Sequence, residues 1–248
     1  MNETAIRDKL VERGGTLFHA PKQELVRFTK VDAADRLLND LVTTPHAFVL
    51  ACIMDRQITA ERAWLIPHVI SERLGDFSID KLAQLSRAEI KRLLSDPKPL
   101  HRFVDTMSGL FHAGVQRITN NYSGDAARIW DGNPSSAEVV YRFLEFDGAG
   151  PKIATMAANI LARDFKIKFA DYFSIDISVD RQVRRVFDRL GLCPGQASVE
   201  QVIYKARALH PKFPGIMDFP CWEIGRNWCH ARAPNCSACY MNELCPTA

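Results

Sequence analysis

The sequence lacks any long apolar run. No stretch of its 248 residues approaches the roughly 20 apolar residues that a membrane-spanning helix needs. The N-terminal segment from Met1 to Arg13 is charged and lacks the apolar core of a secretory signal peptide. We therefore expect no membrane partner and a cytoplasmic location.

The sequence also has little net charge, no internal repeat and almost no strand pattern. Its net charge of +3 permits a nucleic-acid partner without requiring one. Apolar residues recur at helical spacing along most of the chain, and only Phe165 to Phe169 alternates as a strand would. The 47% hydrophobic content is enough for one large or two small cores. These features predict an all-α fold.

The expected helices are separated by glycine, proline and polar turns. Ser78 and Ser86 are expected to cap the starts of two of them, because a serine hydroxyl accepts a hydrogen bond from the first helical turn. Gly14 and Gly15 are expected to follow the end of the first helix. The pattern predicts helices over residues 3–13, 33–41, 47–54, 60–74, 79–85, 87–94, 100–122, 136–144, 153–161, 179–190, 199–209 and 219–228.

A Gly-x-Gly turn, Gly148-Ala149-Gly150, lies between two amphipathic helical segments. Glycine permits a left-handed turn and lets a phosphate approach the backbone closely. Pro151 suits the first helical position, and the free N–H groups of a helix start attract anions. This pattern resembles the helix-hairpin-helix of DNA-binding proteins, and an ordinary helix-to-helix turn is the alternative.

Seven cysteines are present, and four of them, Cys229, Cys236, Cys239 and Cys245, lie in the last twenty residues. A disulfide framework would spread them along the chain, so a metal site is the better interpretation. Four-cysteine zinc sites usually contain two C-x2-C pairs, whereas this segment has one. A 4Fe–4S cluster accepts one pair with two outlying cysteines, often with a trailing proline such as Pro246. The spacing favours the cluster over zinc. The remaining cysteines, Cys52, Cys193 and Cys221, are expected in the core.

Another helical segment begins near Asp180 and places Val183, Val186 and Phe187 on one apolar face. Asp180 is expected in its first turn, where the helix dipole stabilises a negative charge. Taken alone, Asp180 is an ordinary carboxylate at a helix start.

The order of hairpin, Val-Asp helix and four-cysteine loop resembles the endonuclease III family of DNA base-excision glycosylases. The resemblance runs from Pro45 to the C-terminus, and the lead-in Gly225 to Cys229 is its most specific part beside the cysteine spacing. It implies two helical domains with the active-site cleft between them. One is a central barrel over residues 31–165 that contains the hairpin, and the other joins residues 1–30 to 166–248 and holds the cluster.

The resemblance also implies a partner, double-stranded DNA whose damaged or mismatched base is flipped out of the helix. We expect a monomer associated with the nucleoid. Lys152 matches the lysine that distinguishes glycosylase/lyases, and Asp180 matches the catalytic aspartate. Gln57 matches the glutamine that fills the gap left by the flipped base. Other DNA contacts are expected from Gly148, Gly150 and Arg232.

Each of these assignments has an alternative. Lys152 could bind phosphate only, as in a monofunctional glycosylase, and Gln57 could be a solvated surface residue. A non-catalytic DNA-binding protein with a metal staple is a third interpretation, although phosphate binding alone gains nothing from the carboxylate of Asp180. The pattern itself does not name the base that is removed.

The chain departs from the family pattern in several places. Asp55 and Arg56 stand before Gln57 where relatives have small residues, and Asp147 replaces a proline before the hairpin glycine. The interval between Lys152 and Asp180 is longer than usual, so residues 161–174 form an insertion. Arg232 is the only firmly charged cation in the cysteine segment, where relatives often carry more.

The expected chemistry follows from the charges. Cleavage of an N-glycosidic bond leaves positive charge on the sugar, which a nearby carboxylate such as Asp180 stabilises. Lys152 sits at the positive end of its own helix, which disfavours an ammonium ion there. The free amine could attack the sugar C1′ and form a Schiff base.

Overall fold

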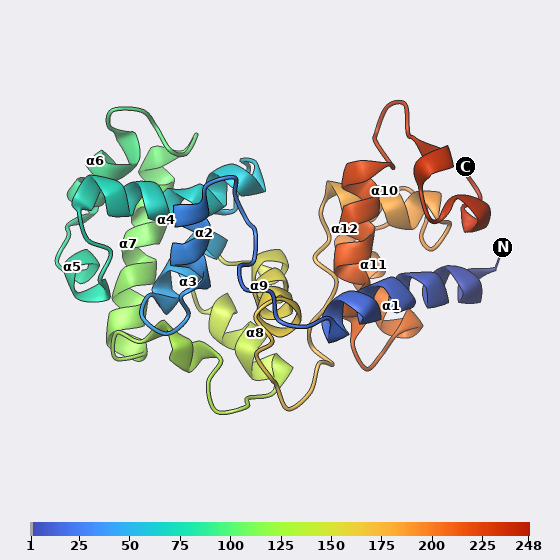
Figure 1. Ribbon diagram of the computed structural model, residues 1–248, viewed down its shortest axis with the longest axis horizontal. Helices are drawn as coiled ribbons and strands as arrows, with labels where there is room; N and C mark the ends of the chain where they lie inside the picture. The colour runs from blue at the N-terminus through green and yellow to red at the C-terminus, as the bar shows by residue number, and fades with distance from the viewer. Residues whose placement is uncertain (1) are drawn as a thin grey trace. The chain divides into compact units, whose positions relative to one another are not determined.

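A computed structural model describes residues 2–248, which form helices and no β-strand. The chain divides into two compact units (Figure 1). Unit 1 contains residues 1–22, 135–140 and 158–248, and unit 2 contains residues 23–134 and 141–157. The predicted all-α fold is confirmed. None of the described helices is long and apolar enough to cross a membrane.

Unit 2 is built around α3 (Pro45–Met54), all of whose residues are buried. Its apolar sequence has no polar face, so it must be covered on every side. Helices α2, α4 and α7 pack against it. The helices that precede the hairpin are α2 (Asp32–Asn39), α4 (Ala60–Leu74), α5 (Ile79–Ala83), α6 (Arg87–Ser95), α7 (Val104–Asn121) and the short 3-10 helix η1 (Ala126–Ile129).

Unit 1 brings together segments from both ends of the sequence. Its apolar core includes Ile6 and Leu10 from the first helix together with Val186, Phe187 and Ile224 from the last third of the chain. These core residues come from opposite ends of the chain, so unit 1 is discontinuous in sequence. Its elements are α1 (Glu3–His19), α10 (Arg181–Arg189), α11 (Val199–Leu209), α12 (Asp218–Asn227), η2 (Pro214–Met217), η3 (Cys236–Ala238) and η4 (Asn242–Leu244).

The two helices predicted on either side of the Gly-x-Gly turn are present as α8 (Ser136–Leu144) and α9 (Pro151–Arg163). Each of these helices contributes residues to both units.

The helix starts at Ser78 and Ser86 are confirmed, because both hydroxyls accept a backbone hydrogen bond and Ser86 forms a full capping box with Glu89. The bounds predicted for the two functional domains stay a prediction.

The prediction that the first helix ends before Gly14 is wrong, because α1 continues to His19. Gly14 is buried, and a Cβ atom built there would lie 2.0 Å from the carbonyl oxygen of Ile216. The glycine therefore marks a close approach between α1 and η2 rather than a turn.

The strand considered for Phe165 to Phe169 does not form, and α9 ends at Arg163 inside the insertion. The remainder of the insertion is an irregular segment tied to unit 1. Lys166 donates hydrogen bonds from Nζ to the carbonyl oxygens of Leu17 and Phe18, at 3.2 and 2.7 Å, and so satisfies the C-terminal end of α1. The backbone N–H of Ser174 donates to Ser136 Oγ at the start of α8.

Candidate active site and cysteine cavity

The hairpin turn depends on its two glycines in different ways. Gly148 has a φ of 86°, and a Cβ there would lie 2.6 Å from Leu110. A Cβ atom on Gly150 would meet no other part of the protein within 4 Å, so the outer side of this glycine is open. Gly148 therefore supplies the left-handed conformation, and Gly150 leaves room for a ligand to approach the start of α9.

Lys152 is the second residue of α9 and forms an ion pair with Asp55, which directly follows α3. The distance from Lys152 Nζ to Asp55 Oδ2 is 3.0 Å. The lysine side chain is 40% exposed, whereas the aspartate side chain is 8% exposed. Sequence reasoning noticed Asp55 only as a departure from the family pattern and missed it as the partner of Lys152.

Residues 55–57, which we call the DRQ turn, are attached to the hairpin by a further contact. Arg56 donates a hydrogen bond from Nη1 to the carbonyl oxygen of Gly148 at 3.1 Å. The carbonyl oxygen of Arg56 in turn accepts a 2.9 Å hydrogen bond from Nε2 of the fully buried His101. Arg56 and His101 thus hold the turn independently of Asp55.

His101 is neutral in this arrangement. The backbone N–H of Phe103 donates to His101 Nδ1 at 3.1 Å, so Nδ1 carries no proton while Nε2 donates to Arg56. Burial lowers the pKa of His101, which favours the same neutral form.

Gln57 completes the DRQ turn in an unusual backbone conformation. Its φ is 54°, in the left-handed region that non-glycine residues rarely adopt, and its side chain is exposed. Such strain often accompanies function, because packing alone would select a glycine at this position. The assignment of Gln57 to the gap left by a flipped base stays a prediction.

Asp180 is held by backbone groups. Its Oδ1 accepts hydrogen bonds from the N–H groups of Gln182 and Val183, at 2.7 and 2.8 Å. Asp180 is therefore the N-cap of α10, one residue before the first turn in which it was expected. Because both amides bind Oδ1, Oδ2 accepts no hydrogen bond from any described residue and is the oxygen available to a ligand.

The segment leading to Asp180 is anchored at several points. The backbone N–H of Ser178 donates to Asp218 Oδ1 at 2.6 Å, and the N–H of Gly215 donates to the carbonyl oxygen of Ile175 at 2.7 Å. Arg207 makes two hydrogen bonds with the Asp176 carboxylate, each of 2.7 Å. These contacts fix the backbone that presents the Asp180 carboxylate.

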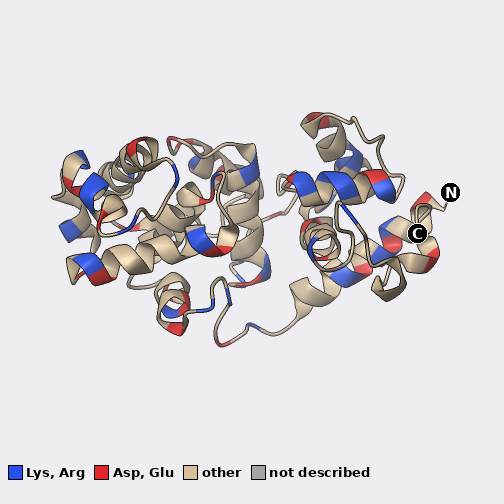
Figure 2. Cartoon of the chain, turned by 90° about the horizontal axis from the view of Figure 1, so that it is seen from above, with Lys and Arg blue, Asp and Glu red and all other residues tan. Residues whose placement is uncertain are grey.

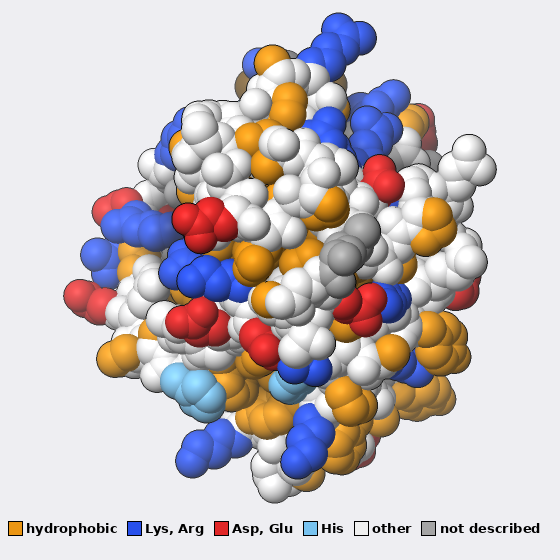
Figure 3. Space-filling model, turned by 90° about the vertical axis from the view of Figure 1, so that its right-hand side faces the viewer, with side chains coloured by type: hydrophobic (Ala, Val, Ile, Leu, Met, Phe, Trp, Pro, Cys, Tyr) orange, Lys and Arg blue, Asp and Glu red, His pale blue; other side chains and the backbone are white. Residues whose placement is uncertain are grey.

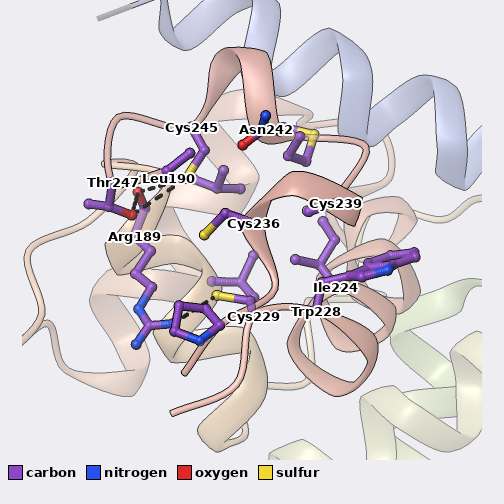
Figure 4. A pocket seen from close by; sticks show the side chains of 14 residues that line it. Arg189, Leu190, Ile224, Trp228, Cys229, Cys236, Cys239, Asn242, Cys245 and Thr247 are labelled. Atoms are coloured by element: carbon purple, nitrogen blue, oxygen red, sulfur yellow. Dashed lines mark hydrogen bonds between the residues drawn. The ribbon is translucent and has the colours of Figure 1, made fainter. Parts of the chain in front are cut away.

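The four C-terminal cysteines line one cavity of about 190 Å³ in unit 1. Figure 4 shows Cys229, Cys236 and Cys245 around this space with Arg189 along one side. Arg189 donates from Nη1 to Cys229 Sγ at 3.4 Å and to the carbonyl oxygen of His230 at 2.7 Å. The Sγ of Cys245 donates to the carbonyl oxygen of Arg189 at 3.5 Å.

Burial raises the pKa of the Cys239 thiol, and the other three cysteines of the cavity raise it further. Among residues 2–248, no group of three or more His, Cys, Asp and Glu side chains converges on a single metal-ion position. A tetrahedral zinc site would need four sulfurs about 2.3 Å from one centre. Four thiols on the wall of one cavity form a donor set suited to a metal centre.

The remaining sequence candidates lie on the surface or in the core. Arg232 is exposed in the cysteine segment, and its DNA contact stays a prediction. Cys52 and Cys221 are fully buried, as expected. Cys193 is only half-buried, which corrects its assignment to the core.

Residues of both charge signs are interspersed along the described chain (Figure 2). On the face shown in Figure 3, lysines and arginines likewise alternate with acidic and apolar side chains, so among the described residues this face carries no continuous basic patch.

No family model matches the sequence. The chain is 25% identical to endonuclease III of Synechocystis over 216 residues, which cover 83% of this chain and 82% of the relative. Its fold matches a trapped endonuclease III–DNA covalent intermediate with a TM-score of 0.63 and 19% identity, over 100% of this chain and 97% of the other. It also matches a thermostable thymine-DNA glycosylase with a TM-score of 0.64 and 16% identity, over 97% and 95% of the two chains.

These likenesses define the class of fold, the helix-hairpin-helix fold shared by DNA glycosylases. Within it, the chain is endonuclease III-like, and the resemblance stated from its motifs is confirmed.

Proposed function

We propose that this chain is a DNA base-excision glycosylase with AP lyase activity. The observation that carries the proposal is the position of Lys152, which lies in the first turn of α9, two residues after the open Gly150. A DNA phosphate bound at this helix start would bring the sugar of the adjoining nucleotide close to the amine. The endonuclease III of similar fold is trapped on DNA in a covalent intermediate, which supports the same assignment.

In this proposal Asp180 and Lys152 act on the same nucleotide. Oδ2 of Asp180 stabilises the positive charge that develops on the sugar as the base leaves. Lys152 attacks C1′ and forms a Schiff base, after which the 3′ phosphate is eliminated. Gln57 occupies the gap left by the flipped base, and the hairpin glycines with Arg232 contact the DNA backbone.

We further propose that Cys229, Cys236, Cys239 and Cys245 hold a 4Fe–4S cluster. Their shared cavity and their contacts with Arg189 support this ligand set. When bound, such a cluster would cross-link the four cysteines of the C-terminal segment. Its role would be structural rather than catalytic. Arg189 would keep Cys229 and Cys245 in place through its side chain and its carbonyl oxygen.

A second candidate is a monofunctional glycosylase in which Lys152 binds phosphate only. One observation favours it, because the Asp55 carboxylate 3.0 Å from Lys152 Nζ stabilises an ammonium ion. An ammonium ion is suited to phosphate but cannot attack a carbon atom. The two candidates therefore differ in whether Lys152 becomes covalently bound to DNA.

Reductive trapping separates them. Borohydride added during turnover on a panel of duplexes, each with one lesion, should crosslink the wild-type protein to DNA and identify the excised base. Lys152→Gln should abolish the crosslink and strand nicking, whereas Lys168→Gln, on an exposed lysine of the insertion, should change neither. Base release without crosslinking in the wild type would establish the monofunctional enzyme. Crosslinking that survives in Lys152→Gln would assign the nucleophile elsewhere.

A further inference from the structure

The Asp55–Lys152 pair joins two helix ends, and each charge lies at the electrostatically disfavoured end. Asp55 is the C-cap of α3, where the helix dipole presents partial negative charge to the carboxylate. Lys152 is in the first turn of α9, where the dipole presents partial positive charge to the ammonium group. Neither helix end therefore stabilises the charge that it carries.

The surroundings of the pair act in the same direction. The Asp55 carboxylate is almost completely buried, and the fully buried Cys52 lies on the helix behind it. The carboxylate is thus withdrawn from water, whereas the lysine side chain is 40% exposed and open to a ligand. The guanidinium group of Arg56 is turned to the carbonyl oxygen of Gly148 and so does not serve as the counterion of its neighbour.

A purely structural role for the pair is a weak explanation. Arg56 already attaches the DRQ turn to the hairpin, and His101 holds the turn from its other side. The ion pair is also a weak source of stability, because withdrawing its carboxylate from water offsets part of the attraction between the two charges. The pair thus needs an explanation beyond fixing the turn.

We propose that Asp55 is a positioning residue that orients the Lys152 amine and accepts its proton before the amine attacks DNA. This inference rests on the proposed lyase function. The Lys152 ammonium group gives one proton to the Asp55 carboxylate, and the nitrogen lone pair then forms a bond to the C1′ aldehyde of an abasic sugar. The resulting carbinolamine loses its hydroxyl group as water, using the proton held by Asp55. The products are the iminium ion, one water molecule and the regenerated Asp55 carboxylate.

The experiment uses a duplex with a preformed abasic site, so that base release does not limit the reaction. Single-turnover borohydride trapping is followed from neutral to alkaline pH for wild type, Asp55→Asn and the surface control Glu72→Gln. Asparagine keeps an oxygen that accepts a hydrogen bond from Lys152 but cannot take up its proton. The ionisable neighbours of the pair are Cys52, which interacts electrostatically with both members, and Arg56, which follows Asp55 in the sequence, and both are the same in all three proteins.

We expect Asp55→Asn to slow trapping at neutral pH by about 10²-fold, within the range of general-base catalysis, and to recover as solvent deprotonates the amine at higher pH. Glu72→Gln should match wild type. Binding to a duplex with a reduced abasic analogue should be unchanged in Asp55→Asn. If that variant fails to fold, Asp55→Ser, which also removes the carboxylate, replaces it with the same expectation.

The outcomes separate the two proposals. Equal trapping by wild type and Asp55→Asn at every pH would overturn the role of Asp55 and leave the lyase function intact. Slow trapping that does not recover at high pH and is accompanied by lost DNA binding would also overturn it, in favour of a structural contact. No trapping by wild type would overturn the lyase function itself, and with it this inference.

Discussion

The two candidate catalytic side chains are held in place by different kinds of contact. Lys152 in unit 2 depends on a single side-chain partner, Asp55, at the end of another helix. Asp180 in unit 1 is held by two backbone N–H groups of the helix that it caps. A side-chain contact can be lost by one substitution, whereas backbone donors remain whatever residue follows. The position of Asp180 should therefore be robust, and that of Lys152 should be sensitive to its neighbour.

The largest expected effect follows from removing the charge of Asp180, the residue that is held by backbone N–H groups. Asparagine is as good an N-cap as aspartate, so Asp180→Asn should preserve the geometry of α10 while removing the charge. We expect base release to fall by about 10²–10³-fold, the loss typical of removing one transition-state stabilising group. The measurement is single-turnover base release, with DNA affinity and the melting temperature as checks that only chemistry has changed.

Asp180→Ala provides the matched comparison. It removes both the charge and the cap, so it should lose the same activity and also about 1 kcal/mol of stability. Near wild-type base release by Asp180→Asn would exclude the carboxylate from catalysis and reduce Asp180 to a helix cap.

A substitution in the cysteine cavity tests whether a bound metal cluster stabilises the C-terminal part of unit 1. Cys245→Ser should abolish the broad visible absorbance of a 4Fe–4S cluster and lower the stability by about 3 kcal/mol, because a lost metal site is among the most damaging changes. Iron and sulfide analysis and the melting temperature are the measurements. Cys193→Ser, outside the cavity, should keep both colour and stability. Colourless wild-type protein that contains one zinc ion would refute the cluster.

A pair of adjacent glycines in α1 offers a test with an internal control. Gly14→Ala places Cβ against the carbonyl oxygen of Ile216 and should destabilise unit 1 by about 3 kcal/mol, the upper part of the range for overpacking. Gly15 has no atom within 4 Å of its Cβ position, so Gly15→Ala should instead stabilise the helix by about 0.5–1 kcal/mol. Chemical denaturation measures both. Equal effects of the two substitutions would contradict the close approach of α1 and η2.

These glycines also show where sequence reasoning succeeds and where it stops. The caps at Ser78 and Ser86 and the left-handed Gly148 could be predicted, because each depends on residues adjacent in sequence. The role of Gly14 as a point of close approach inside α1 could not, because the atom that it approaches, the carbonyl oxygen of Ile216, lies about two hundred residues away in the sequence. The Asp55–Lys152 pair was missed for the same reason, since nothing local links an aspartate after α3 to a lysine in α9.

The smallest expected effect concerns the strained Gln57, and it tests whether this residue is retained for function. Glycine adopts a φ of 54° without strain, so Gln57→Gly should leave stability unchanged or raise it by about 1 kcal/mol. It should nevertheless reduce lesion processing several-fold, because the side chain that fills the gap in the duplex is gone. Gln57→Ala should reduce processing equally without the gain in stability.

Lesion processing is compared on a paired lesion and on a substrate whose target base is already unpaired. A gap-filling role predicts a larger loss on the paired duplex, where the flipped state needs support from the enzyme. Equal losses on both substrates would place Gln57 in the chemistry, and no loss on either would make it a surface residue. In that last case the strained backbone at residue 57 would have a structural role only. It would hold Asp55 and Arg56 in the positions from which they contact Lys152 and Gly148.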